Sequence, residues 1–169
     1  VRAALGNHDD PETFQAIMGP LGFVGGGESC HTLNIEGWRV LLLNSMWQGV
    51  KEGFLGADQR YRLREELERD AASPTMIFMH HHVVPLGLPW VDRDNLQDWN
   101  EFLELLGTAG NVRGVFSGHA HQARQHTWRG IPFFVTPSTG YQFAQDVREI
   151  RVDTQEPPAY RIIRVRGDL

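Results

Sequence analysis

The stretch PTMIFMHHH (residues 74–82) joins a short apolar run directly to three consecutive histidines. Such a run predicts a buried strand over 74–79. In α/β folds, ligands bind at the edge where the carboxyl ends of the strands meet. The stretch therefore predicts a central strand that ends at a ligand-binding edge, with histidine side chains placed there.

The rest of the chain alternates between strand and helix patterns. Two hairpins are expected, one over 31–44 with its turn at Glu36-Gly37 and one over 124–135 with its turn at Arg129-Gly130. Further strands are expected at 112–116 and 159–165. Helices are expected over 10–18, where Asp10 is the N-cap, 57–72 and 96–106. This order predicts an α/β fold with a mixed sheet rather than a pure βαβ winding.

Composition limits the class of protein. A chain of 169 residues is expected to form one domain, and no apolar run reaches the 18 or so residues of a membrane span. The formal charge of −5 and the single lysine, Lys51, argue against binding to a nucleic acid backbone. Cys30 is the sole cysteine, so a disulfide within the chain is impossible, which favours the cytoplasm.

Six of the eight histidines follow predicted strands. They occur in three motifs, GNHD (6–9), MHHH (79–82) and GHAH (118–121). Imidazole nitrogen, amide oxygen and carboxylate suit divalent Zn, Mn, Fe, Co or Ni. Because strand ends converge on one edge, these motifs together predict a shared metal site.

Each motif taken alone has a simpler interpretation. GNHD also suits a polar turn, and the three histidines could be a strand end that meets solvent. In an extended chain, GHAH would place His119 and His121 on the same side. His31 and His126 fall on hairpin strands, where surface or packing roles are expected, whereas Trp90 follows the histidine run and could line a pocket.

The three motifs, in this order, resemble those of the calcineurin-like metallophosphoesterases, namely GNH(D/E), a strand that ends in histidine, and GHxH. The segments VTPSTGYQF (135–143) and PAYRIIRV (158–165) are similar to the bacterial class III 3′,5′-cyclic nucleotide (cyclic AMP) phosphodiesterases. The resemblance implies an α/β sandwich in which mixed sheets are flanked by helices. It also implies a metal-dependent hydrolase acting on a small phosphodiester.

Carried over position by position, the resemblance implies that Asn7, His80 and His119 bind one metal ion and that His121 binds a second. His8 would be the catalytic histidine.

The remaining site residues have less specific roles under the same resemblance. Asp9 would orient or acidify the histidine before it. His81 is expected beyond the ligands or in the pocket, and Thr139 is a candidate for contact with the substrate.

The resemblance implies two divalent ions per complete site, with Mn, Fe, Zn or Co as candidates. Two such ions about 3.5 to 4 Å apart lower the pKa of a bridging water, so that a hydroxide attacks phosphorus. The catalytic histidine, if protonated, would stabilise the developing charge or protonate the leaving oxygen.

The chain departs from the family pattern at its start. The family carries D-x-H and G-D motifs before GNH(D/E), and only residues 1–5 precede the motif here. We therefore expect residues 1–169 to be the carboxyl-terminal portion of a single domain, one that alone holds one metal ion or none. Unpaired sheet edges would then favour a homodimer. The alternatives are a catalytically inactive fragment or binding module with a partial metal site and, less favoured, a metal amidase or nuclease.

Overall fold

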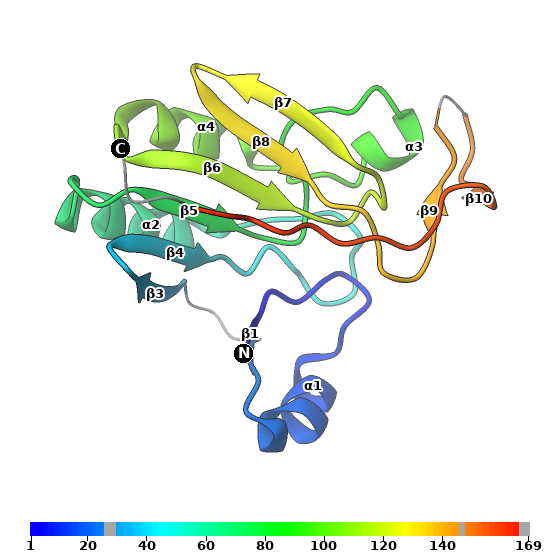
Figure 1. Ribbon diagram of the computed structural model, residues 1–169, viewed down its shortest axis with the longest axis horizontal. Helices are drawn as coiled ribbons and strands as arrows, with labels where there is room; N and C mark the ends of the chain where they lie inside the picture. Colours follow the sequence, from blue (N-terminus) through cyan, green and yellow to red (C-terminus); the bar gives the residue numbers. More distant parts are fainter. Residues whose placement is uncertain (26–29, 146–147, 166–169) are drawn as a thin grey trace.

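The computed structural model describes residues 1–25, 30–145 and 148–165. Within these residues, six strands form one mixed sheet (Figure 1). Its strands, in spatial order, are β3 (His31–Ile35), β4 (Trp38–Leu42), β5 (Thr75–Phe78), β6 (Val112–Ser117), β8 (Ile131–Val135) and β7 (Arg124–Trp128). The four central strands run parallel, and each edge strand pairs antiparallel with its neighbour. The predicted mixed sheet and both hairpins are confirmed.

Two helices cover one face of this sheet, namely α2 (Gly56–Arg69) and α4 (Trp99–Thr108). Leu63 and Leu67 of α2 pack into the core, as their helical spacing predicts. The predicted helix start at residue 96 is wrong, because the amide of Leu96 donates to the His82 carbonyl (2.9 Å) and leaves the helix to begin at Trp99. No helix in the described ranges is both long and apolar enough to span a bilayer.

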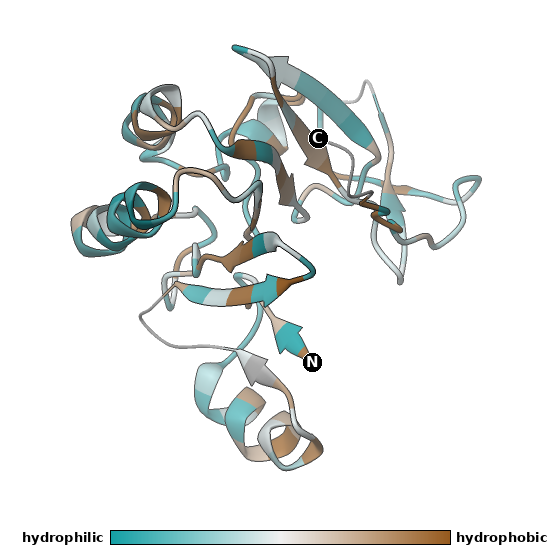
Figure 2. Cartoon of the chain, turned by 60° about the vertical axis from the view of Figure 1, so that its left-hand side comes forward, coloured by the Kyte–Doolittle hydropathy of each residue, from teal (hydrophilic) through white to brown (hydrophobic). Residues whose placement is uncertain are grey.

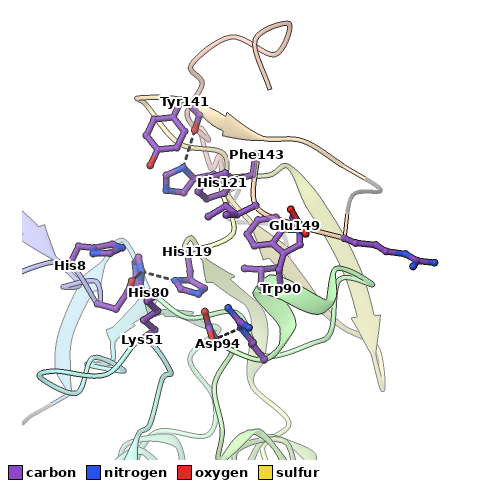
Figure 3. Close-up of a pocket in the computed structure, with 15 residues that line it drawn as sticks. His8, Lys51, His80, Trp90, Asp94, His119, His121, Tyr141, Phe143 and Glu149 are labelled. Carbon is purple, nitrogen blue, oxygen red and sulfur yellow. Dashed lines mark hydrogen bonds and ion pairs between the residues drawn. The ribbon is translucent and has the colours of Figure 1, made fainter. Parts of the chain in front are cut away.

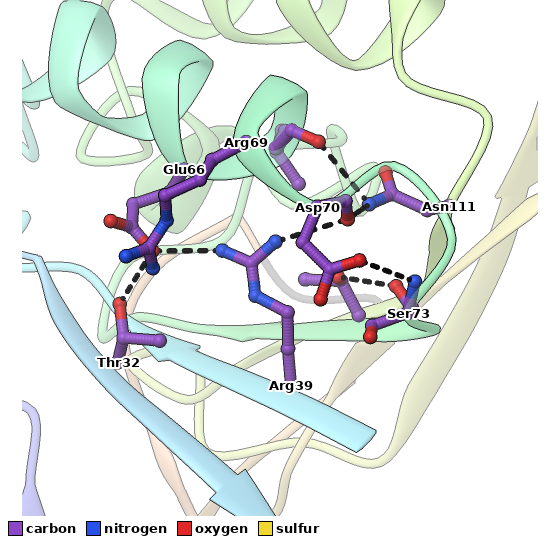
Figure 4. A network of polar contacts seen from close by, with 9 residues as sticks. Thr32, Arg39, Glu66, Arg69, Asp70, Ser73 and Asn111 are labelled. Carbon is purple, nitrogen blue, oxygen red and sulfur yellow. Dashed lines mark hydrogen bonds and ion pairs between the residues drawn. The ribbon is translucent and has the colours of Figure 1, made fainter. Parts of the chain in front are cut away.

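A buried arginine ties the covering helix α2 to the sheet (Figure 4). Arg39, 2 % exposed on β4, donates to Glu66 Oε2 (2.8 Å) and to the Asp70 carbonyl (3.2 Å). Thr32 on β3 and Arg69 on α2 donate to the same Glu66 oxygen. The carboxyl end of α2 is therefore fixed against two adjacent strands.

The opposite face of the sheet is apolar, with a cluster made by Trp38, Val40, Leu42, Met76 and Phe116. Residues 157–165 cross this face (Figure 1), and Arg161 lies over the Phe134 ring and donates to the Val135 carbonyl. The predicted strand over 159–165 is wrong, because this segment lies across the sheet and does not pair along one edge. Tyr160 and Ile162 of this segment are 73 % and 63 % exposed, whereas Arg161 between them lies on the sheet. Figure 2 shows the contrast between hydrophobic β8 and hydrophilic β7.

The first residues form a separate small unit. β1 (Arg2–Ala3) pairs in parallel with β2 (Val24–Gly25), and α1 (Pro11–Met18) and a short 3-10 helix (Gly19–Leu21) connect them. Asp10 caps α1 by accepting from the Thr13 amide (2.8 Å), as predicted. α1 stands away from the large sheet (Figures 1 and 2).

The remaining elements border the site. They are α3 (Pro89–Asp92), β9 (Gln142–Phe143) and β10 (Val152–Asp153), of which the last two pair antiparallel.

Candidate metal centre and its pocket

Two parallel strands bring their following histidines together. β5 and β6 are neighbours in the sheet, so His80 after β5 and His119 after β6 leave at the same edge. The Gly118 amide donates to the His80 carbonyl (2.9 Å), which joins the two loops just beyond the strands. The expectation that these strand ends converge is confirmed.

Three ligand-type atoms meet at this edge. His80 Nε2 lies 3.0 Å from Asn7 Oδ1 and 3.3 Å from His119 Nδ1. Atoms that bind the same ion at about 2.1 Å, as Zn²⁺ ligands do, lie roughly 3.0 to 3.4 Å from one another. His119 Nε2 is buried and has no hydrogen-bond partner among the described residues, so the existing polar contacts leave this imidazole incompletely satisfied. The three side chains fit a divalent cation.

Both histidines are held in the neutral form that a metal ligand requires. Burial, followed by the nearby histidines, lowers the pKa of His80 to about 3. Burial and the same neighbours lower the pKa of His119 to about 2. At neutral pH both imidazoles therefore present lone pairs, and a cation at this edge would not compete with bound protons.

His81 lies in the same cluster, but both of its ring nitrogens make other hydrogen bonds. Its Nε2 lies 3.0 Å from the Lys51 carbonyl, which can only accept, so Nε2 carries the proton. Its Nδ1 then accepts from Ser45 Oγ at 2.9 Å. Burial lowers the pKa of His81 to about 4. Although its ring nitrogen lies within 4.8 Å of those of His80 and His119, both of its nitrogens are occupied, which fits its predicted place beyond the ligands.

His82 is fully buried and orders the loop that follows the histidine run. Its Nε2 lies 3.3 Å from Asp92 Oδ1, and Asp92 also accepts from the amides of Leu86, Gly87 and Leu88. Burial would raise the pKa of Asp92, but the hydrogen bonds from His82 and these amides outweigh it and lower the pKa. Asp92, the last residue of α3, thus uses its carboxylate to hold the turn that precedes this helix.

The GHAH segment is not extended. His119 (φ 64°) and His121 (φ 50°) both have left-handed backbone conformations, which are uncommon for residues other than glycine. The expected extended conformation is therefore wrong, although both histidines line one cavity: His119 faces His80, whereas His121 packs against the Phe143 ring, with ring centroids 4.7 Å apart. His121 Nδ1 donates to the Tyr141 carbonyl (3.0 Å), which leaves Nε2 free as a ligand atom. Burial lowers the pKa of His121.

The GNHD turn carries Asn7 and His8 to the same edge. The Gly6 amide donates to Asp9 Oδ2 (2.7 Å), and the Asp9 amide donates to the Gly6 carbonyl (3.0 Å). Asp9 therefore closes the turn that presents the exposed His8 side chain. Gly6 lies against the His80 imidazole so closely that a Cβ would fall 2.6 Å from His80 Cε1.

These residues open onto one cavity of about 520 Å³ (Figure 3). Five of the predicted site residues line it, namely Asn7, His8, His80, His119 and His121. Thr139 is exposed in the loop after β8 and lies outside the described lining of this cavity, so its substrate contact stays a prediction.

Sequence reasoning missed the aromatic part of the lining. Trp90 lines the cavity, as proposed for it, but it is joined by Tyr141 and Phe143. Both lie in the GYQF segment (140–143), whose aromatic residues next to a glycine were the available signal.

The chain is similar to curated bacterial phosphodiesterases. It is 35 % identical over 138 residues to the 3′,5′-cyclic adenosine monophosphate phosphodiesterase CpdA of Haemophilus influenzae, covering 82 % of this chain and 50 % of that protein. It is 30 % identical over 164 residues to CpdA of Escherichia coli, covering 96 % of this chain and 58 % of that protein. A probable cyclic nucleotide phosphodiesterase of a Synechococcus strain is 40 % identical over 144 residues, covering 85 % of this chain and 54 % of that protein. The chain thus spans about half the length of the curated relatives it matches.

The fold also matches a solved structure. A dimetal phosphatase from Danio rerio superposes with a TM-score of 0.63 at 12 % identity, over 81 % of this chain and 60 % of that one. At this identity the likeness concerns the fold alone. No protein-family model matches the chain.

Proposed function

We propose that this chain, a homologue of bacterial cyclic nucleotide phosphodiesterases with the calcineurin-like metallophosphoesterase fold, is part of a metal-dependent phosphodiester hydrolase. The observation that carries the proposal is the convergence of Asn7 Oδ1, His80 Nε2 and His119 Nδ1 at the strand edge, beside a cavity that His8 and His121 also line. Divalent ions bound there would supply positive charge for the phosphodiester and activate water.

Each residue of this chain has a task under the proposal. Asn7, His80 and His119 hold one ion, and His121 offers Nε2 to a second. His8, exposed at the cavity, protonates the leaving oxygen or stabilises its charge. Asp9 holds the turn that positions His8, through its bond from the Gly6 amide.

The finer parts of the proposal are a dimetal mechanism and 3′,5′-cyclic AMP as substrate. The names of the relatives in Haemophilus influenzae and Escherichia coli support that substrate, and the free Nε2 of His121 at the cavity supports a second ion. Mn, Fe, Zn and Co are the candidate ions, because histidine nitrogen and amide oxygen suit them.

The test is hydrolysis of cyclic AMP and of bis(p-nitrophenyl) phosphate by the purified chain with added Mn²⁺. We expect turnover to disappear in His119→Ala, and we expect His8→Ala to lose about 10² to 10⁴ in rate while it keeps its bound metal. The matched control is His126→Ala on β7, outside the described lining of the cavity, which should keep full turnover. Turnover that persists in His119→Ala would contradict the proposal, and an equal loss of metal and rate in His8→Ala would make His8 a ligand.

A second candidate is a catalytically inactive metal-binding module. It is favoured by the three-atom convergence, which accounts for one ion. Equilibrium dialysis separates the two: metal bound by the chain and lost in His119→Ala, with no turnover of either diester, would establish the module.

The proposal also places the chain in the cytoplasm and includes self-association. The single cysteine supports a reducing compartment. The edge strands β3 and β7, each paired on one side only among the described residues, support a homodimer. Light scattering at rising protein concentration tests the homodimer, and a constant monomer mass would contradict it.

A further inference from the structure

One side of the cavity is aromatic and makes no contribution to the metal cluster. The rings of Trp90 and Phe143 meet edge to face with centroids 5.1 Å apart, and Tyr141 meets Phe143 at 5.4 Å. Figure 3 shows Tyr141 and Phe143 beside His121, with Trp90 on the other side of Phe143. Trp90 comes from α3, Phe143 from β9 and Tyr141 from the residue before β9, so two separate segments build this wall.

The wall carries an unpaired hydrogen-bond donor. Trp90 is 9 % exposed, and its Nε1 is buried without a partner among the described residues. An indole N–H can only donate, and buried tryptophans usually direct this group to an acceptor. Because Trp90 lines the cavity, an acceptor atom on a bound molecule would give Nε1 the partner that the described residues do not provide.

The wall also carries an open aromatic ring. Tyr141 is 46 % exposed and lines the same cavity. Its backbone carbonyl accepts from His121 Nδ1, and its ring lies 4.8 Å from the His121 ring. The open ring is therefore held beside His121 in the cavity that His80 and His119 also line.

We infer that Tyr141 and Trp90 bind the purine base of a cyclic nucleotide, with the base stacked on Tyr141 and a ring nitrogen accepting from Trp90 Nε1. A planar heterocycle offers a partner for both groups, because its π face can stack on the open Tyr141 ring and its in-plane nitrogens can accept from Trp90 Nε1. The inference rests on the proposed function, because the metal centre would hold the phosphodiester of the same molecule. These two residues then determine which organic substituent the site accepts.

The experiment is ligand-observed saturation-transfer NMR of cyclic AMP with the metal-free full chain, where no hydrolysis occurs. We expect the adenine protons to receive more saturation than the ribose protons. Titration should show about fivefold weaker binding in Trp90→Phe, which keeps the ring and loses one donor. Binding should be on the order of tenfold weaker in Tyr141→Ala, which keeps the carbonyl bound to His121.

Matched controls are Trp47→Phe and Tyr61→Ala, two exposed aromatic residues outside the described lining, and both should bind cyclic AMP like the parent chain. The inference is overturned if saturation falls on the ribose alone, if cyclic AMP does not bind at millimolar concentration, or if the Trp90 and Tyr141 variants bind like the controls. Adenine saturation without Mn²⁺-dependent turnover would overturn the proposed function and leave this inference standing. Turnover of cyclic AMP that is unchanged in the Trp90 and Tyr141 variants would leave the proposed function standing and overturn this inference.

Discussion

At the scale of single residues, the site depends on one very close approach. Gly6 has room for no Cβ, because the His80 imidazole fills that space at 2.6 to 2.9 Å. The glycine of the GNHD motif therefore allows Asn7 and His80 to share one point in space. A larger residue would move the imidazole and break the convergence with His119.

We therefore predict that Gly6→Ala weakens Mn²⁺ binding by at least about tenfold, which corresponds to roughly 1.4 kcal/mol or more. The shifted His80 imidazole would lose its bond to the ion or bind it in a poorer geometry. Isothermal titration calorimetry measures the Mn²⁺ affinity of each variant. Gly110→Ala is the control, because a Cβ there meets nothing within 4 Å. Equal affinities in the two variants would show that His80 does not bind the ion.

At the scale of elements, the sheet and its covering helix are joined by the buried guanidinium of Arg39. Its partner Glu66 is one turn from the end of α2, so the ion pair fixes how that end lies on β3 and β4. Removing one member of a buried pair leaves the other charge desolvated, which costs more than the pair itself contributes.

We predict that Glu66→Ala lowers the free energy of unfolding by about 3 kcal/mol, because Arg39 loses its charged partner. Arg69→Ala removes the more exposed cation that contacts the same oxygen, and it should cost less than about 1 kcal/mol. Urea denaturation of both variants measures the difference, and similar losses in the two would contradict the assignment to Arg39.

The elements also show what the sequence can and cannot predict. Hairpins, strands and helices followed from local patterns, such as Glu36-Gly37 with positive φ at both residues of the turn. The segment over 159–165 alternates like a strand, yet an alternating pattern also suits a segment lying across a sheet, and local sequence does not distinguish the two.

For the site, the meeting of His80 and His119 was predictable because the neighbouring strands β5 and β6 end at one edge, whereas Asn7 was added by the resemblance to the metallophosphoesterases. The engagement of both His81 nitrogens and the unpaired Trp90 donor were not predictable, since each depends on residues far away in the sequence.

At the scale of the whole molecule, three histidines of the site, His81 buried and His80 and His119 half-buried, make stability depend on pH. The pKa values of His80, His81 and His119 in the folded chain are about 3, 4 and 2, against 6.5 for a free histidine. Between about pH 6.5 and those values the unfolded chain binds more protons than the folded chain. The free energy of unfolding is therefore intact above pH 6.5 and decreases as the pH falls below it.

We predict that the metal-free chain loses stability from pH 7.5 to pH 5.5, by on the order of 1 kcal/mol per histidine for each pH unit below 6.5. Urea denaturation at both pH values measures this loss. His119→Asn should reduce the pH dependence, whereas His126→Asn should preserve it. A chain whose stability is the same at both pH values would show that these imidazoles become protonated without unfolding.

The small unit made by β1, β2 and α1 pairs within itself, yet it supplies Asn7 to an ion whose other ligands belong to the large sheet. A cation bound there would act as a removable cross-link between two parts of one chain. Its binding free energy would stabilise the contact between the small unit and the large sheet. Amide hydrogen exchange should report this directly. Adding Mn²⁺ should slow exchange in α1 and β2 more than in the distant hairpin β7–β8, and equal slowing throughout would argue against such a link.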